Sequence, residues 1–220
     1  IDKSTKPIRL METLRCCSGH INTVKDHGQH DWAGIGQWGF IPQEEGEFMT
    51  AAVFLDRDDT LIQDTGYMYK PEEFAWKDGA EDSLRLFQQH GLPVFIVTNQ
   101  GGIARAYFTE AQMHIFHDKL LAETAKIGGH ITDIAFCPHH PLSVTEALRT
   151  PCSCRKPEPG MILSLAKKWQ LDLRRSVMIG DKPSDVEAGQ AAGCASYLVG
   201  REQSLLEVAE QAVSVIASRS

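Results

Sequence analysis

From residue 51 onward, short apolar segments alternate with longer amphipathic segments, and this alternation limits the possible folds more than any other feature. Apolar runs without a polar face are typical of strands that are buried on both sides of a parallel sheet. We predict such strands at 51–55, 94–97, 131–136, 177–179 and 197–199. Strands that alternate with helices favour a doubly wound α/β fold, in which ligands bind beyond the carboxyl ends of the strands. The functional residues are therefore expected in the loops that follow the strands.

The segments between these strands carry the signals that begin and end helices. We predict helices over 81–89, over about 109–127, from about 159 and from about 184. Thr109 with Gln112, and Ser184 with Glu187, have the spacing of a capping box, in which two residues satisfy each other's backbone N–H groups. Glycines, which favour helix ends, follow three of these helices: Gly91, Gly128 and Gly193.

The composition is that of one soluble globular domain, with 42% apolar and 23% charged residues in a chain of 220. The net charge of -7 predicts repulsion of nucleic acid and of anionic membranes. No apolar run approaches the roughly 20 residues of a membrane span, and we find no signal-peptide pattern. We therefore expect a cytoplasmic, monomeric enzyme that binds neither nucleic acid nor membranes.

The first fifty residues do not follow the alternation of strands and helices. We interpret residues 1–50 as an N-terminal extension of unknown role, and residues 51–220 as the globular domain. The extension contains several histidines and the pair Cys16-Cys17, but their spacing matches no metal-site template.

Two carboxylates, Asp56 and Asp58, follow the first predicted strand at a spacing of two residues. Both can therefore face one crevice at the end of the sheet. A carboxylate can attack phosphorus to form an aspartyl-phosphate, and a second carboxyl group can protonate the leaving oxygen and later deprotonate water. We expect Asp56 to be the nucleophile and Asp58 the general acid and base.

Three later strand ends supply the other groups that phosphoryl transfer requires. Thr98, before a glycine pair, offers a hydroxyl and backbone N–H groups for phosphate oxygens. Arg155 and Lys156 place cations beside the start of a predicted helix, where anions are already favoured. Asp181 can complete an oxygen shell for Mg²⁺ together with Asp56. Nucleophile, hydroxyl, cation and metal carboxylate in this order predict a magnesium-dependent phosphoryl-transfer enzyme.

Three cysteines and a histidine form two close pairs, Cys137-x-His139 and Cys152-x-Cys154, with a loop between them. Four such ligands fill a tetrahedral Zn²⁺ shell and leave no position for water or substrate, so we expect structural zinc in a loop over 137–154. Two alternatives remain at this stage: unligated thiols, and His140 as the ligand in place of His139.

The motifs resemble those of a known superfamily. Residues 54–61, Thr98, Lys156 and Gly180-Asp181 resemble, in the same order, the four motifs of the haloacid dehalogenase (HAD) superfamily of phosphohydrolases. Within this superfamily, the chain most resembles the heptose bisphosphate phosphatases and the related histidinol-phosphate phosphatases. This resemblance extends over about residues 52–200, and the segments that carry it are 97–105, 137–141, 152–157 and 180–182.

The resemblance implies a role for each motif residue. Asp56 would be the nucleophile, and Asp58 the acid and base that also lends its backbone carbonyl to Mg²⁺. Thr98 and Lys156 would stabilise the phosphoryl group, and Asp181 would be the second carboxylate ligand of Mg²⁺. The family pattern favours His139 as the zinc ligand. We expect further substrate contacts from Asn99, Gln100, Arg155 and Lys182.

The zinc loop directly precedes Arg155 and Lys156, so we expect zinc binding to fold the loop and thereby position these two cations. The chain departs from the pattern at Asp59, where the heptose phosphatases usually carry glycine. The connections after the first two strands are too short for a large cap, which predicts a nearly capless site. Substrate choice would then depend on 63–70, 105–108 and the zinc loop.

The resemblance implies a small phosphorylated sugar as substrate, namely a heptose bisphosphate in carbohydrate metabolism, with histidinol phosphate or another sugar phosphate as the alternative. A more distant alternative is a phospho-accepting receiver domain, which also uses Asp, Thr and Lys on a doubly wound sheet. The proton shuttle at Asp58 and the zinc loop argue against a receiver. A mutase or phosphotransferase has the same motifs, and only its products distinguish it from a hydrolase.

Overall fold

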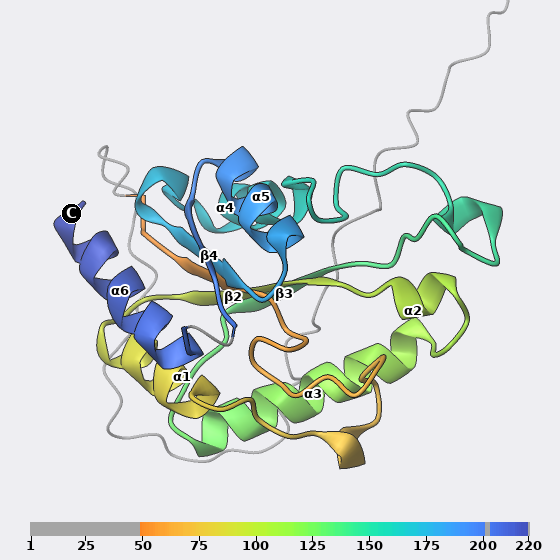
Figure 1. Ribbon diagram of the computed structural model, residues 1–220, viewed down its shortest axis with the longest axis horizontal. Helices are drawn as coiled ribbons and strands as arrows, with labels where there is room; N and C mark the ends of the chain where they lie inside the picture. Colours follow the sequence, from red (N-terminus) through yellow and green to blue (C-terminus); the bar gives the residue numbers. More distant parts are fainter. Residues whose placement is uncertain (1–48, 201–202, 220) are drawn as a thin grey trace, which may run out of the picture.

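The structure is a computed structural model that describes residues 49–200 and 203–219. Five parallel strands form one sheet in the order β3-β2-β1-β4-β5 (Figure 1). The strands are β1 (Val53–Leu55), β2 (Val94–Asn99), β3 (Asp133–Cys137), β4 (Val177–Gly180) and β5 (Ala195–Leu198). The predicted doubly wound parallel sheet is therefore confirmed. The expected extension over residues 1–50 lies, but for its last two residues, outside the described part of the chain.

Burial differs among the five strands. Strands β1, β3 and β4 are buried along their whole length, and β2 is buried up to its last residue. The prediction of burial on both faces is wrong for β5, whose residues are partly or fully exposed. Strand β5 lies at one edge of the sheet, but the fully buried β3 lies at the other edge, so edge position alone does not explain this exposure.

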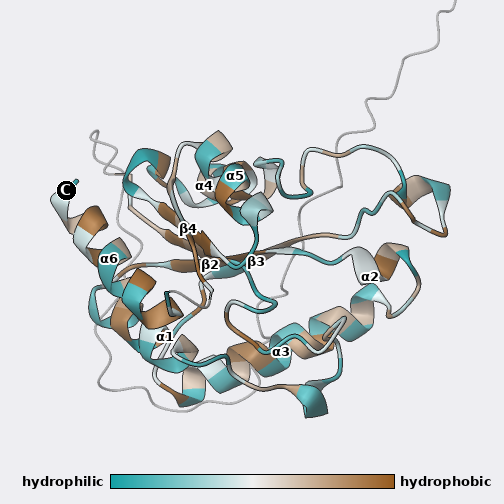
Figure 2. Ribbon diagram, viewed as in Figure 1, coloured by the Kyte–Doolittle hydropathy of each residue, from teal (hydrophilic) through white to brown (hydrophobic). Residues whose placement is uncertain are grey.

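Two layers of helices cover the sheet (Figure 1). On one face lie α1 (Ala80–Gln89), α3 (Glu110–Lys126) and α6 (Leu205–Ser218), and on the other lie α4 (Gly160–Trp169) and α5 (Pro183–Ala192). Alternate residues of a strand pack against different helix layers, because side chains along a strand point to opposite faces of the sheet. In β1, Val53 and Leu55 pack with the first layer and Phe54 with the second. Figure 2 shows the central strands as largely apolar.

The helix α6 was not anticipated from the sequence. It begins with a capping box, in which the Ser204 hydroxyl accepts from the Glu207 backbone N–H and the Ser204 backbone N–H donates to Glu207 Oε2. Its buried residues, such as Val208 and Ala212, pack in the same core as α1. Because this burial completes the first layer of helices, α6 is part of the domain core.

The two predicted capping boxes have different outcomes. The first is confirmed: the Gln112 backbone donates to Thr109 Oγ1 at 3.2 Å, and the Thr109 backbone donates to Gln112 Oε1 at 2.8 Å. The second, at Ser184, is wrong, because α5 begins at Pro183 with Lys182 as its N-cap. Pro183 has the backbone geometry of a first helical residue. The carboxylate that reaches back to the Lys182 backbone, at 2.9 Å, is that of Asp185.

No extra domain is inserted within residues 49–200. The connection from β1 to α1 contains one short 3-10 helix, Pro71–Glu73, and the connection from β2 to α3 contains the short helix α2 (Gly101–Ala104). The predicted nearly capless architecture agrees with these short connections. In the described part of the chain, no helix is both long and apolar enough to cross a membrane.

Candidate active site

The parallel register brings three strand ends together at the carboxyl edge of the sheet. Leu55 pairs with Ile96 of β2 and with Ile179 of β4, so the residues that follow these strands lie side by side. Asp56, only 4% exposed, follows β1, and its backbone N–H donates to Ile179 O at 2.9 Å. Thr98 lies near the end of β2 and Asp181 directly after β4. These predicted site residues are therefore neighbours.

A buried lysine connects this edge to the segment that follows the zinc loop. Lys156 is 5% exposed, and its Nζ lies 2.6 Å from Asp56 Oδ1 and 2.7 Å from Asp185 Oδ1. Burial by itself lowers the pKa of Lys156, but these two carboxylates outweigh it and raise the pKa above its usual value. The ammonium group is therefore charged and directed at the predicted nucleophile.

Asn99 holds the backbone of that lysine. Its Oδ1 accepts from the Lys156 N–H, and its Nδ2 donates to the Lys156 carbonyl, both at 3.0 Å. The side chain that we expected to contact substrate therefore fixes the position of the cation.

Three carboxylates gather beside the lysine. Oxygens of Asp56, Asp181 and Asp185 all lie within 4.8 Å of one another. Burial and the Asp56 carboxylate raise the pKa of Asp181 to about 6, against the opposing effect of Lys182. A cation would relieve this repulsion, and a donor set made only of oxygens suits Mg²⁺. The residues present fit the magnesium ion that the motifs predict.

Asp185 was missed in the sequence analysis. It is 1% exposed and lies in the first turn of α5, directed back toward the strand end. Gly180 makes its approach possible, because a Cβ at Gly180 would lie 2.4 Å from the Asp185 Cβ. The available signal was its place four residues after Asp181, one helical turn along the same segment.

Asp58 is held by two neighbours. Burial raises its pKa above the ordinary value, while the adjacent guanidinium of Arg57 opposes that rise. Gln100 Nε2 donates to Asp58 Oδ2 and to Thr98 Oγ1, each at 2.8 Å. The Gln100 side chain, expected to contact substrate, is therefore already engaged with two predicted catalytic groups.

Asp59, the residue that departs from the family pattern, adopts a left-handed backbone conformation with φ 61°. Glycine enters this region without strain, and aspartate tolerates it better than most residues, which explains how either can occupy the position. The Asp59 carboxylate is 3.1 Å from Lys77 Nζ, and both side chains are partly exposed. They line a pocket of about 530 Å³ with Thr60 and Asp181. The extra charge is thus paired with a lysine and lies outside the carboxylate group.

The remaining predicted substrate contacts lie at the rim. Arg155 Nη1 donates to the His139 carbonyl at 2.9 Å, and Lys182 Nζ lies 3.2 Å from Asp181 Oδ2. The first contact joins a rim cation directly to the zinc loop.

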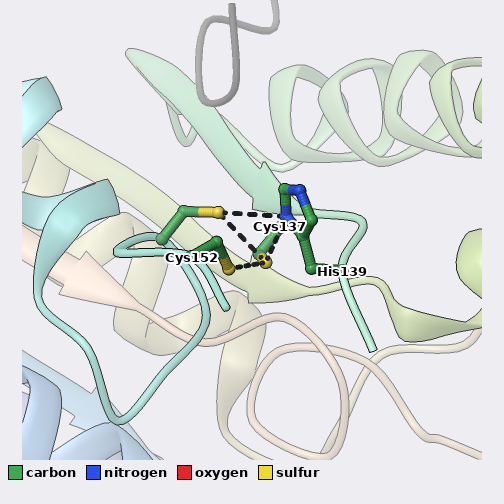
Figure 3. A group of neighbouring side chains, drawn as sticks. Cys137, His139 and Cys152 are labelled. Carbon is green, nitrogen blue, oxygen red and sulfur yellow. Dashed lines mark hydrogen bonds between the residues drawn. The ribbon is translucent and has the colours of Figure 1, made fainter. Parts of the chain in front are cut away.

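The four predicted zinc ligands meet in one cluster. Cys137 Sγ lies 3.2 Å from Cys154 Sγ, 3.7 Å from Cys152 Sγ and 3.5 Å from His139 Nδ1. Figure 3 shows Cys137, His139 and Cys152 directed toward one another. His139 and not His140 belongs to the cluster, because His140 Nδ1 accepts from the backbone of Leu142. Three thiols and an imidazole nitrogen suit a tetrahedral Zn²⁺ site.

Comparisons with known proteins agree with this geometry. A family model described as HAD-hydrolase-like matches residues 153–217. A D-glycero-β-D-manno-heptose-1,7-bisphosphate 7-phosphatase of Rhodopseudomonas palustris is 41% identical over 170 residues, which cover 74% of this chain and 94% of the relative. The protein of the same name from Escherichia coli strain K12 is 39% identical over 150 residues, 68% of this chain and 78% of the relative.

A solved structure is similar over nearly its whole length. The D,D-heptose 1,7-bisphosphate phosphatase of B. bronchiseptica, complexed with magnesium and phosphate, has a TM-score of 0.65 at 30% identity, covering 75% of this chain and 99% of that chain. The parallel sheet and the strand-end cluster define a HAD-like hydrolase. The chain belongs to the family of HAD-like phosphatases that includes the D-glycero-D-manno-heptose-1,7-bisphosphate 7-phosphatases, and it is a phosphatase. Magnesium is the cofactor of this superfamily.

Proposed function

We propose that this phosphatase removes the 7-phosphate of D-glycero-D-manno-heptose 1,7-bisphosphate through an aspartyl-phosphate on Asp56. The observation that carries the mechanism is the buried contact of Asp56 with Lys156, at 2.6 Å, beside the carboxylates of Asp181 and Asp185. The substrate rests on the names of relatives that are about 40% identical to this chain.

In the first step, an oxygen of Asp56 attacks phosphorus as the bond between phosphorus and the sugar oxygen breaks. Asp58 gives its proton to the leaving oxygen, and its raised pKa suits a group that must hold that proton. The Lys156 ammonium and the Thr98 hydroxyl stabilise the charge that develops on the phosphoryl oxygens. The dephosphorylated sugar leaves, and the phosphoryl group stays on Asp56.

In the second step, water attacks the phosphorus of the aspartyl-phosphate, and Asp58 accepts a proton from that water. The bond between phosphorus and the Asp56 oxygen breaks, which releases inorganic phosphate and restores both carboxyl groups. The same Asp58 carboxyl therefore serves as acid in one step and as base in the other.

The carboxylates of Asp56 and Asp181, with the backbone carbonyl of Asp58, would hold Mg²⁺, and Asp185 lies within reach of the same group. When bound, the ion supplies positive charge that neutralises phosphoryl oxygens. Zinc on Cys137, His139, Cys152 and Cys154 would be structural and would hold the loop that carries Arg155.

A panel of phosphomonoesters assayed with Mg²⁺ tests the proposed function. We expect the highest kcat/KM with heptose bisphosphate, and the α and β anomers should be compared, because relatives are named for each. A preference for histidinol phosphate would replace the substrate and keep the mechanism. Transfer of the phosphoryl group to a second alcohol, in place of release as inorganic phosphate, would indicate a phosphotransferase.

A further inference from the structure

A fully buried arginine lies between the two catalytic carboxylates in the sequence, and the mechanism above gives it no task. Arg57 is 0% exposed, so its guanidinium does not reach a substrate in the open site. A buried charge of this kind is costly unless its donors are paired. The partners of Arg57 therefore indicate its role.

One side of the guanidinium is hydrogen-bonded to the Asp58 carboxylate. Asp58 Oδ1 lies 2.8 Å from Nε and 2.7 Å from Nη2, and Asp58 Oδ2 lies 3.0 Å from Nη2. Contacts from two guanidinium nitrogens to both oxygens restrict the orientation of a carboxyl group as well as its distance. A lysine, with one point charge on a flexible chain, would not reproduce this geometry.

The other side is braced by the helix α3 and by the loops around it. Nη1 lies 3.0 Å from His117 Nε2, Nη2 donates to the Met68 carbonyl at 2.9 Å, and the guanidinium lies 4.9 Å from the centre of the Phe116 ring. Since a guanidinium only donates, His117 Nε2 must accept, so His117 is neutral with its proton on Nδ1. Burial and the charge of Arg57 lower the pKa of His117 well below its usual range, in agreement with that state.

Gln100 closes the network on the substrate side. Its Oε1 lies 3.2 Å from Arg57 Nη2, whose two hydrogens are shared among Asp58, Met68 and Gln100, and its Nε2 donates to Asp58 and to Thr98. One continuous set of hydrogen bonds thus runs from His117 on α3 to Thr98 on β2. Each member restricts the orientation of the next.

We propose that Arg57, braced by His117 and Gln100, is a positioning residue that holds the Asp58 carboxyl group in the orientation from which it protonates the leaving oxygen. This inference rests on the proposed function, since it concerns the acid of that reaction. It assigns a part in catalysis, through His117, to α3, which packs against the segment that follows β1 (Figure 1).

The test compares two leaving groups. The sugar alkoxide of heptose bisphosphate needs a proton to leave, whereas p-nitrophenolate leaves without one. The value of kcat/KM reports the first step, because that step releases the alcohol. For Arg57→Lys, we expect kcat/KM to fall about 100-fold with heptose bisphosphate, in the range of general acid catalysis, and less than about fivefold with p-nitrophenyl phosphate. Asp58→Asn should show the same selectivity with a larger loss.

Two substitutions of His117 test the same role of Arg57 if Arg57→Lys does not fold. His117→Leu removes the acceptor of Arg57, and His117→Gln offers an amide oxygen in its place. We expect a selective loss with the sugar substrate for His117→Leu and recovery of most of it for His117→Gln. Arg85→Lys, at an exposed ion pair with Asp82, is the matched control and should leave both substrates unaffected.

Equal losses with both substrates, or no loss, would overturn the inference while the proposed function stands, since Arg57 would then be structural. If the wild-type protein hydrolysed no phosphomonoester, the proposed function and this inference would fall together. If it preferred another alkyl phosphate, the same comparison would be made with that ester.

Discussion

Two clusters of side chains that could bind a metal lie at the carboxyl edge of the same sheet, and they are assembled differently. The carboxylates of the first come from the ends of β1 and β4 and from α5, and only the tertiary fold unites them. The thiols and imidazole of the second come from one short segment, 137–154. Packing therefore preorganises the carboxylate site, whereas the cysteine and histidine site would depend on the metal to order its loop. Two adjacent residues connect the clusters: Arg155 donates to the carbonyl of His139, and Lys156 contacts Asp56.

The largest loss of activity is expected for a substitution in the carboxylate cluster, at Asp56. Asp56→Asn removes the proposed nucleophile but keeps the shape of the packed edge, so we expect kcat to fall by about 10⁴-fold or more while the protein stays folded. Phosphate release and thermal unfolding measure the two effects. Asp82→Asn, at an exposed ion pair, is the control and should change neither. Substantial activity in Asp56→Asn would contradict the aspartyl-phosphate mechanism.

The cysteine and histidine site is tested by Cys152→Ser. We expect loss of bound zinc and a fall in kcat/KM of about 10-fold to 100-fold, because the loop no longer fixes Arg155 and Lys156. Metal analysis and kinetics with p-nitrophenyl phosphate measure both. Cys194→Ser, a buried cysteine outside the cluster, should keep zinc and activity. If Cys152→Ser lost zinc but kept full activity, the link between the two clusters would be wrong.

The carboxylate site should show a pH dependence that magnesium reverses. Since the pKa of Asp181 is raised to about 6 in the folded protein, against about 3.9 in an unfolded chain, the folded state holds the extra proton between these values. Stability without metal should therefore fall as pH rises from about 4 to about 6, and stabilisation by Mg²⁺ should grow over the same window. Urea unfolding with EDTA or with Mg²⁺ measures this.

Asp181→Asn tests whether Asp181 causes this pH dependence. The variant removes one titrating group, while Asp58 and Asp185, whose pKa values are also raised, remain. We expect a smaller fall in stability with pH and a weaker response to Mg²⁺. A magnesium effect that is the same at pH 4 and at pH 7 in the wild type would contradict the assignment of the site.

The smallest effect is expected at Asp59, which borders the carboxylate site without belonging to it. Asp59→Gly relieves a left-handed backbone but loses a partly exposed ion pair with Lys77, so the free energy of unfolding should change by less than about 1 kcal/mol. Asp59→Ala loses the pair and keeps the strain, so it should be the less stable variant. Urea unfolding measures the change in stability, and kcat/KM with heptose bisphosphate shows whether this position affects the reaction. A large change in kcat/KM for Asp59→Gly would place Asp59 within the reacting site.

Much of the molecule follows from local sequence patterns. Each apolar run became a strand of the parallel sheet, because a run without a polar face suits burial on both sides. The box at Thr109 formed as predicted, because its partners are neighbours in the sequence. The pairs 137–139 and 152–154 could likewise be identified from their spacing alone. The box at Ser184 failed because α5 begins one residue earlier, at Pro183, and the Lys182 backbone N–H donates to Asp185, a carboxylate of the candidate metal group.

The amino-acid sequence by itself determined the strands, the order of the motifs and the chemical type of each site residue, since these depend on neighbours along the chain. Only the tertiary structure decided which partners those residues have. Asp185 entered the carboxylate site because α5 packs against the end of β4, and Gln100 and Asn99 turned out to hold Asp58 and Lys156. The partners of Arg57 lie up to 60 positions away, at His117, and no local pattern carries such contacts, because packing of distant segments creates them.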